Sequence, residues 1–247
     1  MKLTSSGRAL VDPALEVLDA LRRAQVAVQS ADHGELGLVR IAFAGVSTHR
    51  LVARLARKVR SQRPGIQLEL SSQNFAQPAM KKLVQGETDI ALGRWDIMPA
   101  EVSAQVVMRD SLALALPDTH ALAGAHRLSP GQLAGESVIS LPPQEGSVLS
   151  DRLRRLAHAN GFVADVVQVA PDTLTALALV SAEVGCHLTL ASVARNVNDP
   201  RVVFVALNES TPTLDVHLRA SWRRDDESPA LKAVLDELLA FEDAAPQ

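Results

Sequence analysis

The stretch Gly37-Leu-Val-Arg-Ile-Ala-Phe-Ala-Gly-Val-Ser-Thr48 decides the fold of this chain. Apolar residues fill nearly every position up to Ala44, which predicts a strand covered on both faces, as in the middle of a parallel sheet. The strand ends at Gly45, where Ser47 and Thr48 open a long amphipathic helix. Hydroxyl side chains and free backbone amides at a helix start suit a polar ligand. We therefore expect one corner of a ligand-sensing site here.

Strand and helix patterns alternate along the rest of the chain. The first helix carries a buried stripe from Leu51 to Val59 and ends at Arg63-Pro64-Gly65. Further helices are predicted over residues 77–85, 148–160, 173–182 and 229–241. Further strands are predicted over residues 66–70, 89–93, 112–116, 138–141, 163–169, 186–190, 202–206 and 214–222. This alternation is typical of parallel sheets, and its two rounds predict two α/β lobes.

Polar or charged residues follow several of the predicted strands. In open α/β sheets, ligands bind outside the carboxyl ends of the strands. The candidate positions are Ser47-Thr48, Asn74-Phe75, Arg94-Trp95, residues 144–147 and the surroundings of Thr189. These segments are far apart in the sequence, but a cleft between two lobes would bring them together.

Arg94 is the most informative charged residue because it ends an apolar strand. A guanidinium fixed there can clamp a carboxylate with two hydrogen bonds. The alternatives are a surface charge or an internal ion pair, for which Glu183 is a candidate partner. Ser47 and Thr48 are equally open to a capping role, which is compatible with ligand binding. Trp95 either lines the mouth of a cleft or fills the interior of a lobe.

The bulk composition argues against several classes of protein. The 247 residues suffice for one large or two small domains, and the net charge of -3 gives no general attraction to nucleic acid. Aromatic residues make up only 3% of the chain, which argues against a stacking platform for bases. The single cysteine, Cys186, excludes an internal disulfide and fits a reducing cytoplasm. The sequence shows neither a leader pattern nor an apolar run near ~18 residues, so we expect neither secretion nor a membrane span.

The familiar catalytic and cofactor-binding motifs are absent from the sequence. It contains no Gly-x-Ser-x-Gly elbow, no phosphate loop, no Gly-x-Gly-x-x-Gly fingerprint and no Cys/His cluster with metal spacing. Cys186 and His187 are neighbours, so a strand would point them to opposite faces. We interpret Cys186 as a small buried apolar residue, and His187 as a hydrogen-bonded wall residue with a ligand contact as the alternative. We expect no enzyme activity, no cofactor and no metal.

The first 35 residues do not resemble the start of a globular domain. Asp12-Pro13 is a good N-cap and first-turn pair. Behind it, residues at alternating spacings of four and three form a possible coiled-coil seam with one polar interruption. The seam residues are Ala14, Leu18, Leu21, Gln25 and Val28. The alternative is an ordinary amphipathic helix that packs on its own domain.

Seven segments in order resemble the regulatory part of LysR-type transcriptional regulators, and the likeness covers essentially the whole chain. The segments are Gly37–Phe43, Arg63–Leu70, Gly86–Gly93, Leu114–Ala123, Leu179–Gly185, Ala191–Ala194 and Ser221–Leu231. The resemblance implies an α/β fold with two Rossmann-like lobes of the periplasmic-binding-protein type II kind, joined by two crossovers and preceded by a linker helix.

The same resemblance implies a division of the chain. Residues 1–35 would be a remnant of the DNA-binding region and a linker or dimerisation helix. Residues 36–111 and 213–247 would form the first regulatory lobe, and residues 112–212 the second. The family's winged helix-turn-helix would precede Met1, so promoter DNA would be bound only through that missing domain. The chain would sense a small-molecule effector and form a homodimer or homotetramer in the cytoplasm.

The effector contacts that the resemblance implies fall at the strand ends picked out above. With Arg94, they are Val46, Ser47, Thr48, Asn74, Phe75, Ser147, Val148, Leu149 and Thr189. The sequence Leu92-Gly93-Arg94 is similar to members that respond to aromatic-breakdown intermediates such as muconate, so a carboxylate effector is one expectation. Glu183 and Leu190 depart from the family pattern, which has a glycine and often a proline there. The competing functions are a stand-alone solute-binding protein of the same fold and a small α/β enzyme.

Overall fold

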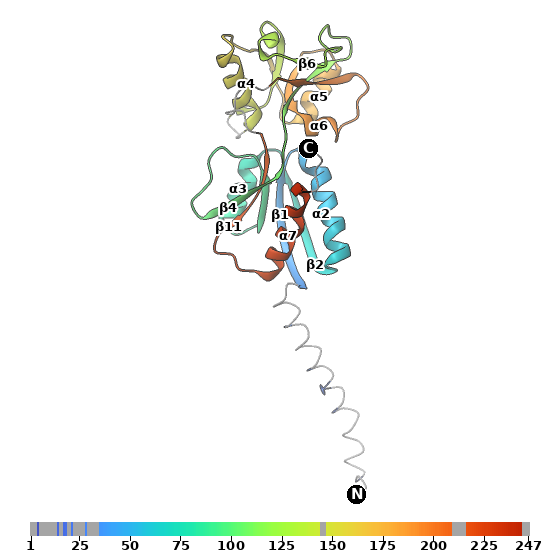
Figure 1. Ribbon diagram of the computed structural model, residues 1–247, viewed down its shortest axis with the longest axis vertical. Coiled ribbons are helices and arrows are strands. Elements are labelled where there is room, and N and C mark those ends of the chain that lie inside the picture. The colour runs from blue at the N-terminus through green and yellow to red at the C-terminus, as the bar shows by residue number, and fades with distance from the viewer. Residues whose placement is uncertain are drawn as a thin grey trace.

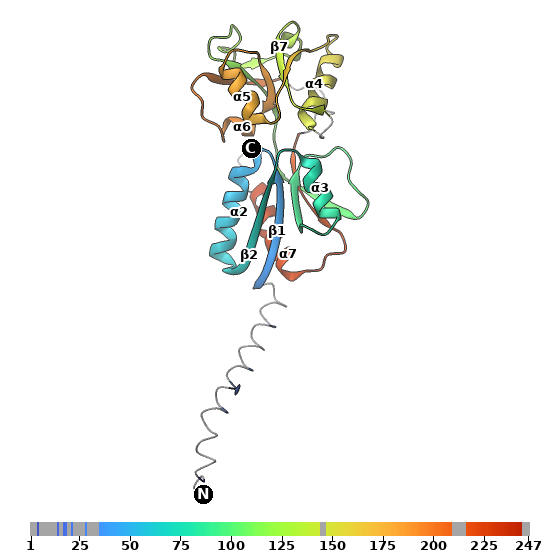
Figure 2. The same cartoon turned by 180° about the vertical axis from the view of Figure 1, so that it is seen from behind.

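The structure is a computed structural model that describes residues 35–143, 147–208 and 216–243, together with the single positions 4, 14, 17, 18, 21 and 28. Two α/β units are stacked end to end, and the chain passes between them twice (Figure 1). Figure 2 shows the same arrangement from behind. We call the lower unit, which holds the five-stranded sheet, the first lobe, and the upper unit the second lobe.

The sheet of the first lobe is built around the opening stretch of the sequence. Strand β1 (Leu36–Ala44) pairs in parallel with β2 (Gly65–Gln73) on one side and β3 (Ile90–Gly93) on the other. Beyond β3, β11 (Leu218–Arg223) runs antiparallel and carries the edge strand β4 (Val102–Met108). The central position of β1 agrees with its apolar sequence, because both of its faces are covered.

Helices cover both faces of this sheet. On one face, Val39, Ile41 and Phe43 pack with the buried sides of α2 (His49–Gln62) and α7 (Pro229–Asp243). On the other face, α3 (Ala76–Val84) packs on Ala42 and Ala44. Between β1 and α2 the chain turns at Gly45, whose φ of 74° favours glycine, and passes through the short helix η1 (Val46–Thr48).

The second lobe has a four-stranded sheet in the order β6-β10-β5-β9 and a two-stranded sheet, β7-β8. A bridge between Val138 and Cys186 joins the two sheets. The bounds of the strands are β5 (Leu112–Pro117), β6 (Arg127–Leu128), β7 (Ser137–Ser140), β8 (Asp165–Val169), β9 (His187–Leu190) and β10 (Val202–Leu207). One apolar core of buried residues from these strands and their helices holds the lobe together.

The helices of the second lobe begin at recognisable caps. Ser129 forms a capping box at η2 (Pro130–Leu133). Ser147 precedes α4 (Val148–Ala159), and Asp172 accepts a hydrogen bond from the Thr175 backbone at α5 (Thr173–Ser181). The short helix α6 (Ala191–Ala194) follows β9 directly. Polar residues therefore mark the starts of η2, α4 and α5, whereas the apolar Leu190 precedes α6.

The predicted parallel pairing is correct around β1 and between β7 and β8, but it is wrong for β11 and β5. Strand β11 is antiparallel to β3 and β4, and β5 is antiparallel to β9 and β10. The reason is the path of the chain: β5 follows the passage into the second lobe and β10 precedes the return, so the two run in opposite directions. The sequence also did not predict β4 or α6, and β2 extends through Gln73, where a loop was expected.

The chain leaves the first sheet after Met108 and enters the second at Leu112, and it returns between Leu207 and Leu218. The predicted division at 111 and 112 falls in the first passage. The predicted division at 212 and 213, the start of the predicted strand at Leu214 and residues 144–146 lie outside the described residues. The two lobes as separately moving units remain a prediction.

Part of the predicted N-terminal seam can be described. Ala14, Leu18, Leu21 and Val28 are helical and exposed, and the side chains of the last three are 56%, 56% and 61% accessible. These side chains are therefore not buried against the first lobe. Gln25 lies outside the described residues, and pairing of the seam with a second subunit stays a prediction.

Candidate functional site

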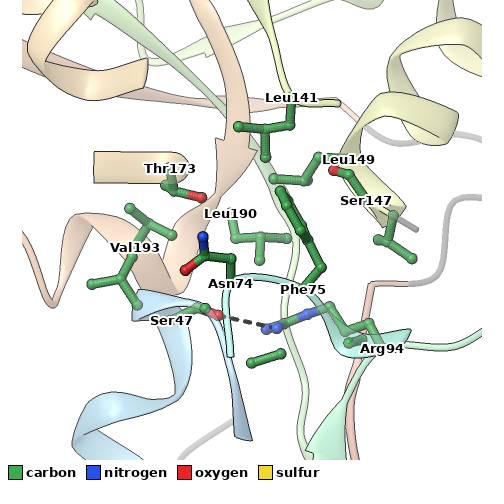
Figure 3. Close-up of a pocket in the computed structure, with 15 residues that line it drawn as sticks. Ser47, Asn74, Phe75, Arg94, Leu141, Ser147, Leu149, Thr173, Leu190 and Val193 are labelled. Atoms are coloured by element: carbon green, nitrogen blue, oxygen red, sulfur yellow. Dashed lines mark hydrogen bonds between the residues drawn. The ribbon is translucent and has the colours of Figure 1, made fainter. Parts of the chain in front are cut away.

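A pocket with a cavity volume of about 70 Å³ lies between the two lobes. The first lobe contributes the ends of β1, β2 and β3, and the second lobe contributes the starts of its helices (Figure 3). The lining residues are Ala44, Gly45, Val46, Ser47, Asn74, Phe75, Ala76, Arg94, Leu141, Ser147, Val148, Leu149, Thr173, Leu190 and Val193. The carboxyl ends of the parallel strands thus meet the second lobe at this pocket, as the general rule for open α/β sheets predicts.

Helices α3, α4 and α5 begin at the pocket. The first residue or the cap of α3, α4 and α5 is among the lining residues, namely Ala76, Ser147 and Thr173. A helix start presents free backbone N–H groups and a partial positive charge. No aspartate or glutamate is among the described residues that line the pocket. The field in the pocket therefore favours an anionic ligand group.

Arg94 is almost completely buried and is held by three different partners. Its Nε donates to the carbonyl oxygen of Val216 at 2.6 Å, and its Nη1 donates to Ser47 Oγ at 3.0 Å. Its Nη2 forms an ion pair with Asp110 Oδ2 at 2.6 Å. The dashed line in Figure 3 marks the contact with Ser47. The internal ion pair considered for Arg94 is thus present, and the guanidinium also contacts the hydroxyl of Ser47 at the edge of the pocket.

Asp110 is the residue that connects this arginine to the second lobe. Its Oδ2 also accepts from Ser192 Oγ at 2.5 Å, and its Oδ1 accepts from the backbone N–H of Ser192 at 3.1 Å. The backbone N–H of Asp110 donates to His217 Nδ1 at 3.1 Å. Asp110 thus ties together the first passage, the second passage at His217 and the start of α6.

The acid that pairs with Arg94 is Asp110 and not the predicted candidate Glu183. Glu183 lies at the end of α5 with a φ of 60° and accepts a hydrogen bond from Thr119 Oγ1. The position of Asp110 between an apolar stretch and the strand at Leu112 was a signal, since an acid at a lobe boundary can reach both lobes. Its partner, however, is 16 residues away in the sequence and follows from the tertiary fold alone.

Eight of the ten residues predicted to contact an effector line this pocket. They are Val46, Ser47, Asn74, Phe75, Arg94, Ser147, Val148 and Leu149. Thr48 is not among the lining residues, because its Oγ1 turns back to the carbonyl oxygens of Ala44 and Gly45 at 3.2 and 2.7 Å. Thr189 is fully buried and is not a lining residue either, whereas its neighbour Leu190 is. Effector contact itself stays a prediction for all ten.

Other lining residues were not predicted as contacts. Leu141, Leu190 and Val193 give the second lobe an apolar wall, and Thr173 adds a hydroxyl at the start of α5 (Figure 3). Leu141 ends one predicted strand and Thr173 comes after another, so the strand-end rule would have found them. Trp95 fills the interior of the first lobe: it is buried, donates to the carbonyl oxygen of Ala76 and packs on Gly93, where a Cβ would lie 2.6 Å from its ring.

A second ion pair joins the lobes beside the pocket. The guanidinium of Arg152 on α4 forms two hydrogen bonds with the carboxylate of Asp96, one of them from Nη1 to Oδ2 at 3.0 Å. Arg152 Nη1 also donates to Asp151 on the same helix at 2.9 Å. Burial tends to lower the pKa of Arg152, but the hydrogen bonds and charges of Asp96 and Asp151 outweigh it and raise the pKa above its ordinary value.

Cys186 and His187 are both buried in the second lobe. Burial, and then the charge of Glu136, raises the pKa of the Cys186 thiol to about 12, so the thiol stays protonated and unreactive. Burial lowers the pKa of His187 to about 4, although the ring nitrogen Nδ1 contacts the carbonyl oxygen of Ile139 at 2.8 Å. Neither residue lines the pocket, which fits the wall role inferred from the sequence.

The described part of the chain offers no group of three His, Cys, Asp or Glu side chains arranged for a metal ion. None of its helices has the length and apolar character of a membrane span.

Comparison with known proteins identifies the family. A model of the LysR substrate binding domain matches residues 32–242. The chain belongs to the LysR substrate-binding-domain family. Curated relatives include the transcriptional regulator ShiR of Corynebacterium glutamicum, which is 28% identical over 96% of this chain and 79% of its own length. The regulator CatR of Pseudomonas putida is 29% identical over 95% of this chain and 79% of its own length.

Solved structures of the LysR family share the fold. The LysR family regulator CbnR has a TM-score of 0.81 at 19% identity, over 96% of this chain and 81% of CbnR. The effector-binding domain of BenM, solved with its effector benzoate, has a TM-score of 0.70 at 19% identity, over 85% of this chain and 95% of that domain. The fold is thus the two-lobed periplasmic-binding-protein type, and this LysR chain serves effector sensing in the control of transcription.

Proposed function

We propose that the pocket between the lobes binds the effector, and that the effector is a small carboxylate with an apolar body. The observation that carries this proposal is the pocket itself, whose lining combines both lobes, three helix starts and no described acidic side chain. A pocket of apolar walls with a few well-placed donors is typical of a small-molecule site. The effectors of relatives are consistent with this class, since BenM is bound to benzoate.

Ser47 is the proposed donor to the carboxylate. Because Ser47 Oγ accepts a hydrogen bond from Arg94, the hydroxyl proton of Ser47 is available to a ligand acceptor. Asn74 lies near Ser47 in Figure 3 and points its amide toward Thr173 of the second lobe. Phe75, Leu149 and Leu190 would contact the apolar body. Arg94 is thus a positioning residue in this proposal and not the clamp that the sequence suggested.

Asp110 offers a physical route from the pocket to the relation between the lobes. A ligand that pulls on Ser47 acts on Arg94, and Arg94 shares the Asp110 carboxylate with Ser192 of the second lobe. Binding shifts the lobe arrangement only if the ligand has different affinities for two arrangements. We propose that this shift changes the geometry of a homodimer or homotetramer and reaches promoter DNA through the DNA-binding domain that regulators of this family carry.

We propose a non-enzymatic role in the cytoplasm, where transcription takes place. Among the described lining residues, Ser47, Ser147 and Thr173 carry hydroxyls, but no histidine or carboxylate lines the pocket to activate them as nucleophiles. A stand-alone solute-binding protein of the same fold would work without a subunit partner, so the oligomeric state separates the two functions. We expect a dimer or tetramer by light scattering, and a strict monomer would count against regulation.

A thermal-shift screen tests the proposed effector class. A ligand that binds only the folded chain raises the melting temperature, and above Kd the stabilisation grows with the logarithm of the ligand concentration. We expect a stabilising hit among small aromatic and aliphatic carboxylates, including benzoate and muconate, and no comparable hit among the matching amides. We expect Ser47→Ala to raise the Kd of the stabilising carboxylate about tenfold, because the variant loses one charge-assisted hydrogen bond.

Ser61→Ala is the matched control, because Ser61 is exposed on α2 and its hydroxyl bonds only the carbonyl oxygen of Lys58 among the described contacts. Equal weakening by both variants, or no weakening by Ser47→Ala, would place the ligand outside this pocket. Stabilisation by amides as strong as that by carboxylates would contradict the anionic class.

A further inference from the structure

The pocket is too small, in the arrangement that the structure shows, for an aromatic carboxylate. Its cavity volume is about 70 Å³, whereas an engineered protein cavity that binds benzene measures about 150 Å³. Enclosing a benzoate-sized ligand between the lobes therefore requires the walls of the pocket to move apart. Because the walls come from both lobes, the contacts between the lobes determine how far the pocket can widen.

Polar contacts join the lobes in three regions. At the joint between them, Asp110 holds both Arg94 and Ser192. On the side of α2 and α6, Arg50 Nη1 donates to the carbonyl oxygen of Arg195 at 2.9 Å. On the other side, Asp96 pairs with Arg152 of α4. Figures 1 and 2 both show α4 above the side of the first lobe that carries α3, and α6 above the side that carries α2.

The Asp96–Arg152 pair lies immediately outside the pocket lining. Arg152 follows the lining residues Val148 and Leu149 by four and three positions, so the three share one face of α4. Asp96 follows the lining residue Arg94 by two positions. The pair therefore fastens the α4 wall of the pocket directly to the end of β3 in the first lobe.

We propose that the Asp96–Arg152 ion pair determines effector size, because it limits how far the α4 wall can move away from the first lobe. The inference rests on the proposed function for the identity of the pocket. Its effect on the distance between the lobes requires no ligand. The pair would thus favour compact ligands, and loss of the pair would admit larger ones.

The surroundings of the Asp96–Arg152 pair would allow ligand binding to separate the two side chains. The two-pronged geometry matches the guanidinium fork to the carboxylate, which makes such a pair stronger than a single contact. The side chain of Arg152 is only 3% exposed, so parting the lobes would change its surroundings strongly. Asp96 is 41% exposed, so water and salt weaken the attraction. Arg152 retains Asp151 on its own helix when the lobes part.

Spin-label distances between the lobes test the tie directly, in the 247-residue chain without ligand. Lys81→Cys on α3 and His158→Cys on α4 are exposed labelling sites, one in each lobe. The native Cys186 is buried and does not compete for the label. We expect Asp96→Asn to increase the population of the longer distance between about threefold and tenfold, as for a pair somewhat stronger than an exposed one.

Two further variants serve as controls. Asp151→Asn removes an acid that contacts the same arginine without crossing between the lobes, and it should leave the distances unchanged. Asp96→Glu keeps the charge and should restore the distances of the unsubstituted chain. Raising the salt concentration should lengthen the distances between the labels in the unsubstituted chain but not in Asp96→Asn. Identical distances in all variants, or equal widening by Asp151→Asn, would overturn the proposal.

Calorimetry with benzoate and 2-naphthoate tests the consequence for ligand size. We expect Asp96→Asn to raise the affinity for 2-naphthoate relative to benzoate about threefold or more, and Asp151→Asn to leave that ratio unchanged. An unchanged ratio in Asp96→Asn would refute the role in ligand size. If neither acid binds any form of the chain, the proposed effector class fails, and the distance measurement alone decides whether the pair holds the lobes.

Discussion

Two close arginine–aspartate pairs, Arg94–Asp110 and Arg152–Asp96, lie where the lobes meet, and Arg155 adds a longer contact of 3.6 Å to Asp96. Arg94 and Asp96 are only two residues apart in the sequence. Arg94 and its partner Asp110 have side-chain exposures of 8% and 0%, and their contact lies at the joint where the chain passes between the lobes. Arg152 and its partner Asp96 have exposures of 3% and 41%, and their contact lies beside the pocket. The same two kinds of side chain therefore meet once away from solvent and once partly exposed to it.

The difference teaches that surroundings assign the roles of these pairs. Breaking a buried pair by removing one partner leaves an uncompensated charge. We therefore expect the Arg94–Asp110 pair to stay intact when the lobes move. A pair with one partner in water can separate at modest cost. The joint pair is thus suited to hold the geometry of Ser47, and the pair beside the pocket is suited to open.

The largest expected effect comes from neutralising the acid at the joint. Asp110→Asn leaves Arg94 buried without its counter-charge, and we expect the free energy of unfolding to fall by about 3–5 kcal/mol. Urea denaturation measures this loss. Ser192→Ala is the matched control, because it removes only a neutral hydroxyl from the same carboxylate and should cost about 1 kcal/mol. Similar losses for the two variants would show that the buried charge pair has no special weight.

His187 extends the comparison to a buried titratable group that has no ionic partner among the described contacts. The pKa of His187 is lowered by burial to about 4, from an ordinary value of 6.5. Between these values the unfolded chain binds a proton that the folded chain does not, so stability decreases as the pH falls. We expect this residue to cost about 2 kcal/mol between pH 6.5 and pH 5.

Denaturation curves of His187→Asn at both pH values measure that cost, because asparagine can replace the contact with Ile139 but does not titrate. The exposed residue His158 provides the control, and His158→Asn should keep the pH dependence of the unsubstituted chain. A steep dependence that persists in His187→Asn would assign the acid sensitivity to other groups.

The smallest expected effect on stability is at the pair beside the pocket. Because Asp96 is 41% exposed and Arg152 keeps Asp151, we expect Asp96→Asn to lower the free energy of unfolding by about 1 kcal/mol or less. The same urea experiment measures it beside Asp110→Asn. A loss as large as that of Asp110→Asn would remove the distinction between the two pairs, and the pair beside the pocket would then be structural.

Much of the candidate site followed from the sequence because local rules place its parts. Gly45 and Asp172 mark the starts of helices, and the apolar run of β1 predicts a central strand. The strand-end rule then selected Ser47, Asn74 and Arg94, which the pocket contains. The same rule also selected Thr48 and Thr189, which do not line the pocket, because the direction of a side chain at a strand end depends on the turn that follows it.

The sequence by itself determined the alternation of strands and helices, the central strand and the ends at which polar residues gather, since periodicity and caps act over a few neighbouring positions. Only the tertiary structure decided the antiparallel pairing of β11 and β5, the partner of Arg94 and the pairing of Asp96 with Arg152. These contacts join residues that are 16 or more positions apart, and no local pattern of side chains encodes which distant residue a folded chain brings within reach.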